Sequence, residues 1–346
     1  MANSTVDMMP VGLESDEESS PFETSVIITS VFNALLIPIC ITGNVLVLAA
    51  VWRNPSLRTP STILLCSLAV SDLFVGFLAL PVNIAIALIP LPRVSSYSLL
   101  SQARFFLIIQ LCGVSLETMT AISVDRYLAL RYHMRYPNMM TSKRATCLAA
   151  TFWCKNVIFS LLSIWKEKTI HLVAAVFIAL CLFISSITYN AIYRIVRHHQ
   201  HQMHAQQQAV QSMNAEQNCK IQAKKRAVNT FIYYICMLLC YFPWAVSSLI
   251  CVTYKEHWNI RWYFADTFMF MNSAINPFLY IWRNREIRRA VLKILRKILC
   301  KTDEENLNNI DQWSWWFICV FILRSRIHLR HCRPKNWHRG SFEETT

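Results

Sequence analysis

Seven long apolar windows constrain this chain of 346 residues more than any other feature of its sequence. A helix needs roughly 20 mainly apolar residues to cross the hydrocarbon core of a bilayer. Windows of about that length lie near 25–52, 61–90, 98–130, 145–165, 170–196, 227–253 and 263–282. Because only short segments join them, we expect an all-α integral membrane bundle of seven transmembrane helices.

The distribution of charge predicts how this bundle is oriented. The formal net charge is +14, yet residues 1–24 carry acidic side chains and no Lys or Arg. Basic residues instead follow every second window, as they do in cytoplasmic loops. We therefore expect a plasma-membrane protein with an extracellular N-terminus, and no binding of nucleic acid. Asn3 begins an N-glycosylation sequence on the correct side of the membrane.

The predicted organisation has four parts. An acidic extracellular tail covers residues 1–24 and the seven-helix domain residues 25–283. Residues 284–300 alternate basic and apolar side chains at helical spacing, which predicts an amphipathic eighth helix on the inner leaflet. Cys300 at its end is a candidate palmitoylation site, and residues 301–346 form a cytoplasmic tail. Residues 198–223, rich in Gln and His, are expected to be a flexible linker, and the cysteines to form no structural disulfide.

Short motifs in several windows resemble those of one receptor family. Asp125-Arg126-Tyr127 ends the third window, and the seventh contains Asn276-Pro277 followed by Tyr280. Further matches are Gly43-Asn44, Asp72 within Leu-Ala-Val-Ser-Asp, Trp153 and Cys-Tyr-Phe-Pro at 240–243. In this order, the motifs resemble the rhodopsin-like (class A) G protein-coupled receptors, and in detail the melanocortin and adenosine receptors.

The resemblance implies a receptor that converts binding of an extracellular small molecule or peptide into activation of a heterotrimeric G protein. A stimulatory G protein that raises cyclic AMP is the first expectation, and no enzymatic activity is expected. In the resting receptor Asp125 would hold Arg126, which would move towards Tyr189 and Tyr280 on activation. The residues implied in this switch are Asp125, Arg126, Tyr127, Tyr189, Tyr241, Pro243, Asn276, Pro277 and Tyr280.

Two features of the sixth helix bear on that switch. Pro243 should kink the helix, because its ring removes a backbone donor and collides with the preceding turn. Ala223 stands where many relatives place an acid that restrains the arginine. Weaker restraint raises the population of the active state, so we expect basal signalling.

Asp72 is an ionisable group in the middle of an apolar window, where an unpartnered charge is costly. The family counterpart binds an allosteric sodium ion, and no other cofactor is expected. The matching oxygen donors here are Ser115, Asn272, Ser273 and Asn276, which suit a hard cation. The alternative is that Asp72 is a protonated, hydrogen-bonded core acid.

The ligand pocket is expected near the extracellular ends of the helices. Helical spacing places Arg104, Ile108 and Cys112 on one stripe of the third helix. The other candidates are Tyr241, Trp244, Ser248 and Asp266. Ile108 replaces the acid that would pair with a biogenic amine, and Ser248 replaces an asparagine of adenosine receptors, which disfavours both ligands.

Two intramembrane charges in these windows leave questions open. Asp266 could receive a cationic ligand group or pair with Arg104 inside the receptor. Lys155 has no partner that the sequence identifies. The alternative functions are a decoy receptor that binds ligand without signalling and a membrane transporter, although a transporter usually shows internal repeats.

Overall fold

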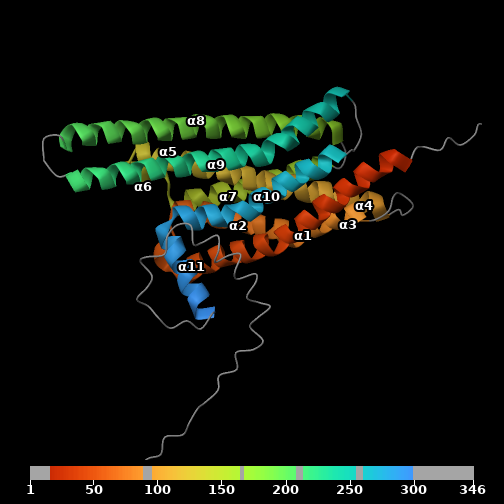
Figure 1. The fold of residues 1–346 in the computed structure, drawn as a ribbon, viewed down its shortest axis with the longest axis horizontal. Coiled ribbons are helices and arrows are strands. Elements are labelled where there is room, and N and C mark those ends of the chain that lie inside the picture. The colour runs from red at the N-terminus through yellow and green to blue at the C-terminus, as the bar shows by residue number, and fades with distance from the viewer. Residues whose placement is uncertain (1–15, 89–95, 164–166, 208–212, 255–259, 299–346) are drawn as a thin grey trace, which may run out of the picture. The chain divides into compact units, whose positions relative to one another are not determined.

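The computed structural model describes residues 16–88, 96–163, 167–207, 213–254 and 260–298, which are almost entirely helical. The elements are α1 (Asp16–Arg53), η1 (Pro55–Leu57), α2 (Pro60–Phe74), η2 (Val75–Ala79), α3 (Leu80–Leu88), α4 (Ser96–Leu107), η3 (Ile108–Cys112), α5 (Gly113–Arg131), α6 (Tyr136–Met139), α7 (Ser142–Ser163), α8 (Glu167–Gln207), α9 (Met213–Tyr254), α10 (Ile260–Arg283) and α11 (Arg285–Ile298). The long helices run side by side as a bundle (Figure 1).

Six of the described helices are long and apolar enough to cross a membrane. Two of them are built from three elements each, because one π-helical turn, η2 or η3, interrupts an otherwise continuous helix. The seventh helix of the bundle, α10, has the necessary length of 24 residues. Its lower hydropathy follows from polar residues such as Asp266, Asn272 and Asn276, which are buried inside the bundle rather than exposed to lipid.

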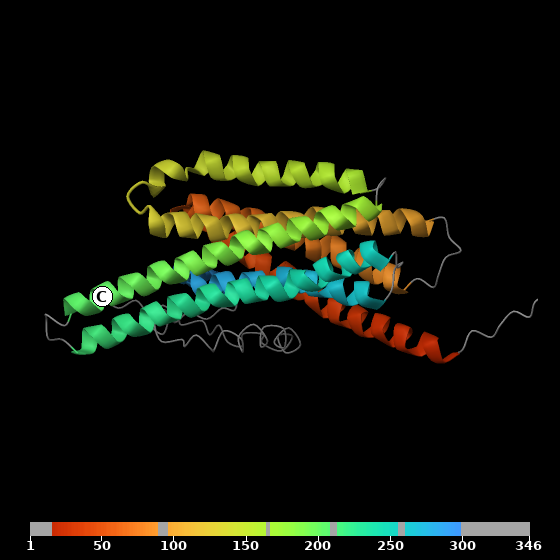
Figure 2. The same ribbon diagram turned by 90° about the horizontal axis from the view of Figure 1, so that it is seen from above.

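Three helices extend beyond the apolar windows. α1 already begins at Asp16, inside the segment expected to be an extracellular tail. α8 continues to Gln207 and α9 begins at Met213, so most of the expected linker 198–223 is helical. The two helices project together beyond the rest of the bundle (Figures 1 and 2). Helix hydrogen bonds are satisfied within the segment, so a polar sequence can continue a helix past the membrane.

Close packing of α1 against α10 depends on a glycine. A Cβ atom added at Gly43 would lie 2.9 Å from Cγ of Pro277, so only glycine permits this approach. The neighbouring Asn44 donates from Nδ2 to the carbonyl oxygen of Ser273 at 3.2 Å. The first window thereby fixes the position of the polar segment of α10.

α2 lies between α1, α5 and α7 and begins at a defined cap. Thr59 accepts a hydrogen bond from the Thr62 amide at 3.3 Å, and Pro60 occupies the first turn, where its missing N–H is not needed. On the neighbouring α7, the indole N–H of Trp153 donates to Oγ of Ser67 at 3.1 Å. These contacts place Asp72 at the centre of the bundle.

The last described helix, α11, runs at a steep angle to α10 in Figure 1. It lies within the segment 284–300 for which an amphipathic helix was predicted. Asn284 caps it, accepting from the amides of Glu286 and Ile287 at 2.9 and 3.3 Å. Cys300 and the tail 301–346 lie outside the described residues, as does Asn3.

Candidate functional site

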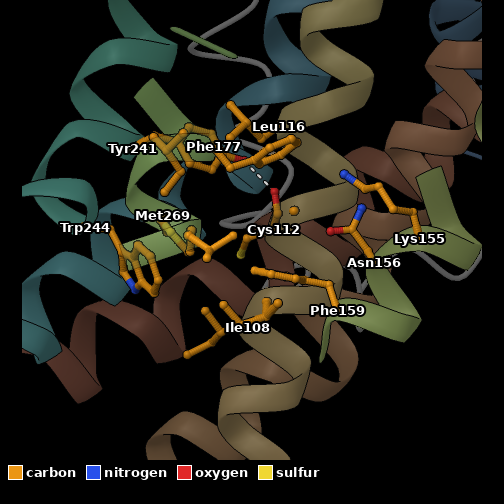
Figure 3. Close-up of a pocket in the computed structure, with 15 residues that line it drawn as sticks. Ile108, Cys112, Leu116, Lys155, Asn156, Phe159, Phe177, Tyr241, Trp244 and Met269 are labelled. Carbon is orange, nitrogen blue, oxygen red and sulfur yellow. Dashed lines mark hydrogen bonds between the residues drawn. The ribbon is translucent and has the colours of Figure 1, made fainter. Parts of the chain in front are cut away.

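A cavity of about 280 Å³ lies among η3, α5, α7, α8, α9 and α10 (Figure 3). Trp244 and Lys155 stand on opposite sides of it, one on α9 and the other on α7. Its walls are mostly apolar and aromatic, as in sites for small molecules. The lining residues are Ile108, Ile109, Cys112, Gly113, Leu116, Lys155, Asn156, Phe159, Val173, Ala174, Phe177, Ile178, Tyr241, Trp244 and Met269.

Four of the seven residues predicted for the ligand pocket line this cavity: Ile108, Cys112, Tyr241 and Trp244. The prediction named no residue of α7 or α8, and both helices contribute to the cavity wall. Arg104, Ser248 and Asp266 do not line the cavity.

Arg104 and Asp266 form a buried ion pair that joins α4 to α10. Their side chains are 5% and 1% exposed, so the pair is withdrawn from solvent and lipid. Arg104 also donates from Nε to Oδ1 of Asn83 at 2.6 Å, and the indole of Trp244 donates to Asp266 at 3.2 Å. Of the two roles considered for Asp266, the structure shows the internal pair. Through Trp244 that pair touches the cavity wall.

Aromatic side chains pack around Trp244 in a cluster that the sequence did not suggest. The ring of His171 on α8 lies 5.8 Å from Trp244 and 4.8 Å from Trp262, measured between centroids. Phe105 lies 5.0 Å from the same histidine. Such tilted ring contacts stabilise the ends of α4, α8, α9 and α10 against one another.

Asp72 lies in the centre of the bundle and is fully buried. Its carboxylate accepts hydrogen bonds from Ser115 at 3.1 Å, Ser273 at 2.7 Å and Asn276 at 2.8 Å. These are the side chains expected around a sodium ion. The side-chain oxygen of Asn276 is buried and has no hydrogen-bond partner among the described residues. An oxygen-rich set with one unused acceptor fits a hard cation.

Asn272 connects this acid to the cavity. Its Nδ2 lies 3.3 Å from Oγ of Ser115 and also 3.3 Å from the hydroxyl of Tyr241. Tyr241 in turn donates to the carbonyl oxygen of Cys112 at 3.2 Å. A chain of buried hydrogen bonds therefore runs from the cavity wall to Asp72 and on to Asn276.

At the other end of α5, Asp125 has hydrogen-bond partners that the sequence did not identify. The carboxylate of Asp125 accepts from Ser61 at 2.5 Å and from the hydroxyl of Tyr136 at 2.7 Å. These donors come from α2 and α6, so Asp125 links both elements to α5. Burial raises the pKa of Tyr136, and its phenol stays protonated as a donor.

Arg126 and Tyr280 line a second cavity, of about 260 Å³, between α2, α5 and the start of α11. Tyr189 on α8 accepts a hydrogen bond from Ser123 at 3.1 Å and packs 5.9 Å from the ring of Tyr234. Tyr127 is partly exposed on α5. Two residues of the predicted switch, Arg126 and Tyr280, thus line one cavity. Tyr189 is hydrogen-bonded to Ser123 on α5, the helix that carries Arg126.

The sequence reasoning missed Glu117, the partner of Lys155. The two side chains form an ion pair between α5 and α7, and Asn156 also donates to Oε1 of Glu117 at 3.2 Å. The ammonium group lies 4.1 Å from the centroid of the Phe177 ring. A signal was present, because an acid and a base in neighbouring apolar windows each require a partner.

Comparison with known proteins agrees with this architecture. Residues 43–171 match the family described as 7 transmembrane receptor (rhodopsin family). The chain is also 28% identical to the adenosine receptor A2b of Gallus gallus over 321 residues, which cover 79% of this chain and 90% of that receptor.

The described helices therefore form a bundle that is similar to membrane receptors of the rhodopsin-like type. More particularly, the chain is similar over 79% of its length to an adenosine receptor. The family matched by residues 43–171 is one of receptors.

Proposed function

We propose that this receptor activates a stimulatory heterotrimeric G protein, and so raises cyclic AMP, when a ligand binds in the cavity lined by Ile108, Cys112, Tyr241 and Trp244. Arg126 is the residue that engages the G protein after α9 moves outward about Pro243. The N-terminus is extracellular and the cavity containing Arg126 faces the cytoplasm, in keeping with the basic segments that follow every second window.

The observation that carries this proposal is the hydrogen-bonded chain from the ligand cavity to the centre of the bundle. A ligand that displaces the Tyr241 hydroxyl changes its contacts with Cys112, at 3.2 Å, and Asn272, at 3.3 Å. Asn272 donates a hydrogen bond to Ser115, which also bonds to Asp72. Asn276 donates to the carboxylate of Asp72 at 2.8 Å. Buried polar networks with two discrete arrangements are the kind of element that couples distant sites.

A sodium ion at Asp72 would stabilise one of those arrangements. Ser115, Ser273 and Asn276 would supply its oxygen ligands together with the carboxylate. A cation bound there holds α2, α5 and α10 together. It therefore favours the inactive receptor, and a ligand that rearranges Asn272 disfavours it.

The similarity to an adenosine receptor does not carry its ligand to this chain. A nucleoside needs several hydrogen-bond partners for its base and ribose, since unpaired buried polar groups are costly. The hydroxyl of Tyr241 and the indole N–H of Trp244 are already bonded within the protein. Lys155 and Asn156 are the other polar side chains of the wall. A less polar ligand fits this cavity better.

The test is cyclic AMP in cells that express the wild type or Arg126→Ala at matched surface levels. The expected result is a basal signal in the wild type that the substitution abolishes. Equal signals in the two receptors would refute the role of Arg126. If neither signals while biosensors for the other G proteins also remain silent, the decoy alternative holds instead.

A further inference from the structure

The ligand cavity reaches from the interior of the bundle to its lipid-facing surface. Trp244 at one side is 2% exposed. On the other side Val173 is 43% exposed and the side chain of Lys155 is 47% exposed. Lys155 is 13 residues from the start of α7 and 8 from its end, which is about 20 and 12 Å by helical rise. It therefore lies at the depth of the hydrocarbon core, and its exposed surface faces lipid. The cavity therefore opens sideways between α7 and α8.

The walls would suit a long apolar molecule with one polar group. Phe159 of α7 and Phe177 of α8 line the cavity along the way from its mouth to Trp244. Asn156 uses its amide donors on Glu117 and on the carbonyl of Phe152. The polar group of a ligand would therefore be recognised at Lys155.

The charge at Lys155 is already balanced. Glu117, 5% exposed, forms an ion pair with it, so the site has no net charge. A carboxylate or phosphate on the ligand would add a net negative charge in a medium of low dielectric constant, which is costly. An ammonium group has three donors, however, and an ester or hydroxyl oxygen can accept from it without changing the net charge.

The surroundings hold the pair in place. A Cβ atom at Gly113 would lie 2.3 Å from Oδ1 of Asn156, so glycine at this position lets Asn156 lie against α5 and reach Glu117. The Phe177 ring, 4.1 Å from the ammonium group, covers it from α8. The cation is thereby fixed at the mouth of the cavity rather than extended into the lipid.

We propose that the ligand of this cavity is a neutral amphipathic lipid, which enters from the bilayer between α7 and α8 and accepts a hydrogen bond from Lys155. Its apolar chain lies along Phe159 and Phe177 and ends near Trp244. This inference rests on the proposed function for the position of the ligand, and it specifies the chemistry and the route of entry.

The experiment uses the full-length receptor in lipid nanodiscs without a G protein. The probe is a long-chain fatty acid methyl ester with a diazirine in its acyl chain, and labelled peptides are mapped by mass spectrometry. Labelling should fall on α7 and α8 residues that line the cavity. The unlabelled methyl ester should compete at least about tenfold better than the free fatty acid or the matching hydrocarbon, a difference of about 1.4 kcal/mol.

Two sets of variants make the test specific. Val173→Trp fills the mouth and should abolish labelling of the cavity, whereas Leu172→Trp adds the same bulk at a position that is 42% exposed and outside the cavity, and should leave it intact. Glu117→Gln combined with Lys155→Met removes the donor without leaving an unpaired charge. It should weaken binding of the ester about tenfold while binding of the hydrocarbon changes less than about twofold.

Labelling that persists in Val173→Trp would mean that the probe marks only annular lipid, and would overturn the proposal. Preference for the free fatty acid would overturn its charge argument. Because binding is measured without a G protein, the result is separable from the proposed function. A receptor that binds the ester but drives no nucleotide exchange refutes the function alone, and one that signals without cavity labelling refutes this inference alone.

Discussion

The ion pair between Arg104 and Asp266 allows a stability prediction with a worked magnitude. Asp266→Asn keeps the size and one acceptor oxygen of the side chain but removes its charge. Arg104, 5% exposed, then remains a buried cation whose neutral neighbours are Asn83 and the new amide. Removing one partner of a buried pair typically costs 3–5 kcal/mol. We expect about 3 kcal/mol here, because Asn83 still accepts from Nε at 2.6 Å.

The measurement is the apparent melting temperature of the purified receptor in nanodiscs, at one heating rate because such unfolding is often irreversible. A loss of about 3 kcal/mol corresponds to a decrease of roughly 4–5 °C in a chain of this length. The matched control is Arg104→Met combined with Asp266→Asn, which leaves no unpaired charge and should recover more than half of the loss. If the double variant is as unstable as the sum of the single variants, the pair is not coupled and the reasoning is refuted.

Three further predictions concern the centre and the cytoplasmic end of the bundle. In the wild type, sodium at ten times its dissociation constant should stabilise the receptor by about 1.4 kcal/mol, and in Asp72→Asn this stabilisation should vanish. An equal thermal shift in the two receptors would contradict the sodium site. Gly113→Ala should lower the stability by about 1–3 kcal/mol, because the new Cβ would lie 2.3 Å from Oδ1 of Asn156. Adding Asn156→Ala should relieve the collision, and additive losses of stability in melting experiments would count against this explanation. Tyr136→Phe removes a 2.7 Å hydrogen bond to Asp125, so this acid should hold the adjacent arginine more strongly. Basal G protein activation should then decrease by up to about tenfold, and an increase would contradict this reasoning.

The helices were predictable because bilayer thickness sets their length, and each of the seven windows coincides with a helix. The ends were less predictable. Polar residues at 198–207 and 213–223 continue α8 and α9, although their composition suggested a linker. Nothing in the local sequence distinguishes the π-helical turns η2 and η3 from ordinary helix.

The candidate site was predictable where one helix sets the spacing. Ile108 and Cys112 share a stripe of the third window, and both line the cavity. The pair of Glu117 and Lys155 was not predictable in this way, because the register of α5 against α7 depends on tertiary packing. For the same reason the sequence did not identify Ser61 and Tyr136, which come from other elements, as partners of Asp125.

Guanine nucleotide exchange on purified G proteins tests the central claim most directly. The wild type and Arg126→Ala, both in nanodiscs and at equal amounts of folded receptor, are assayed with a stimulatory G protein and with representatives of the other classes. We predict that the wild type accelerates exchange on the stimulatory protein and that Arg126→Ala does not. Equal exchange rates with the two receptors, or acceleration of none of the G proteins by the wild type, would contradict the account.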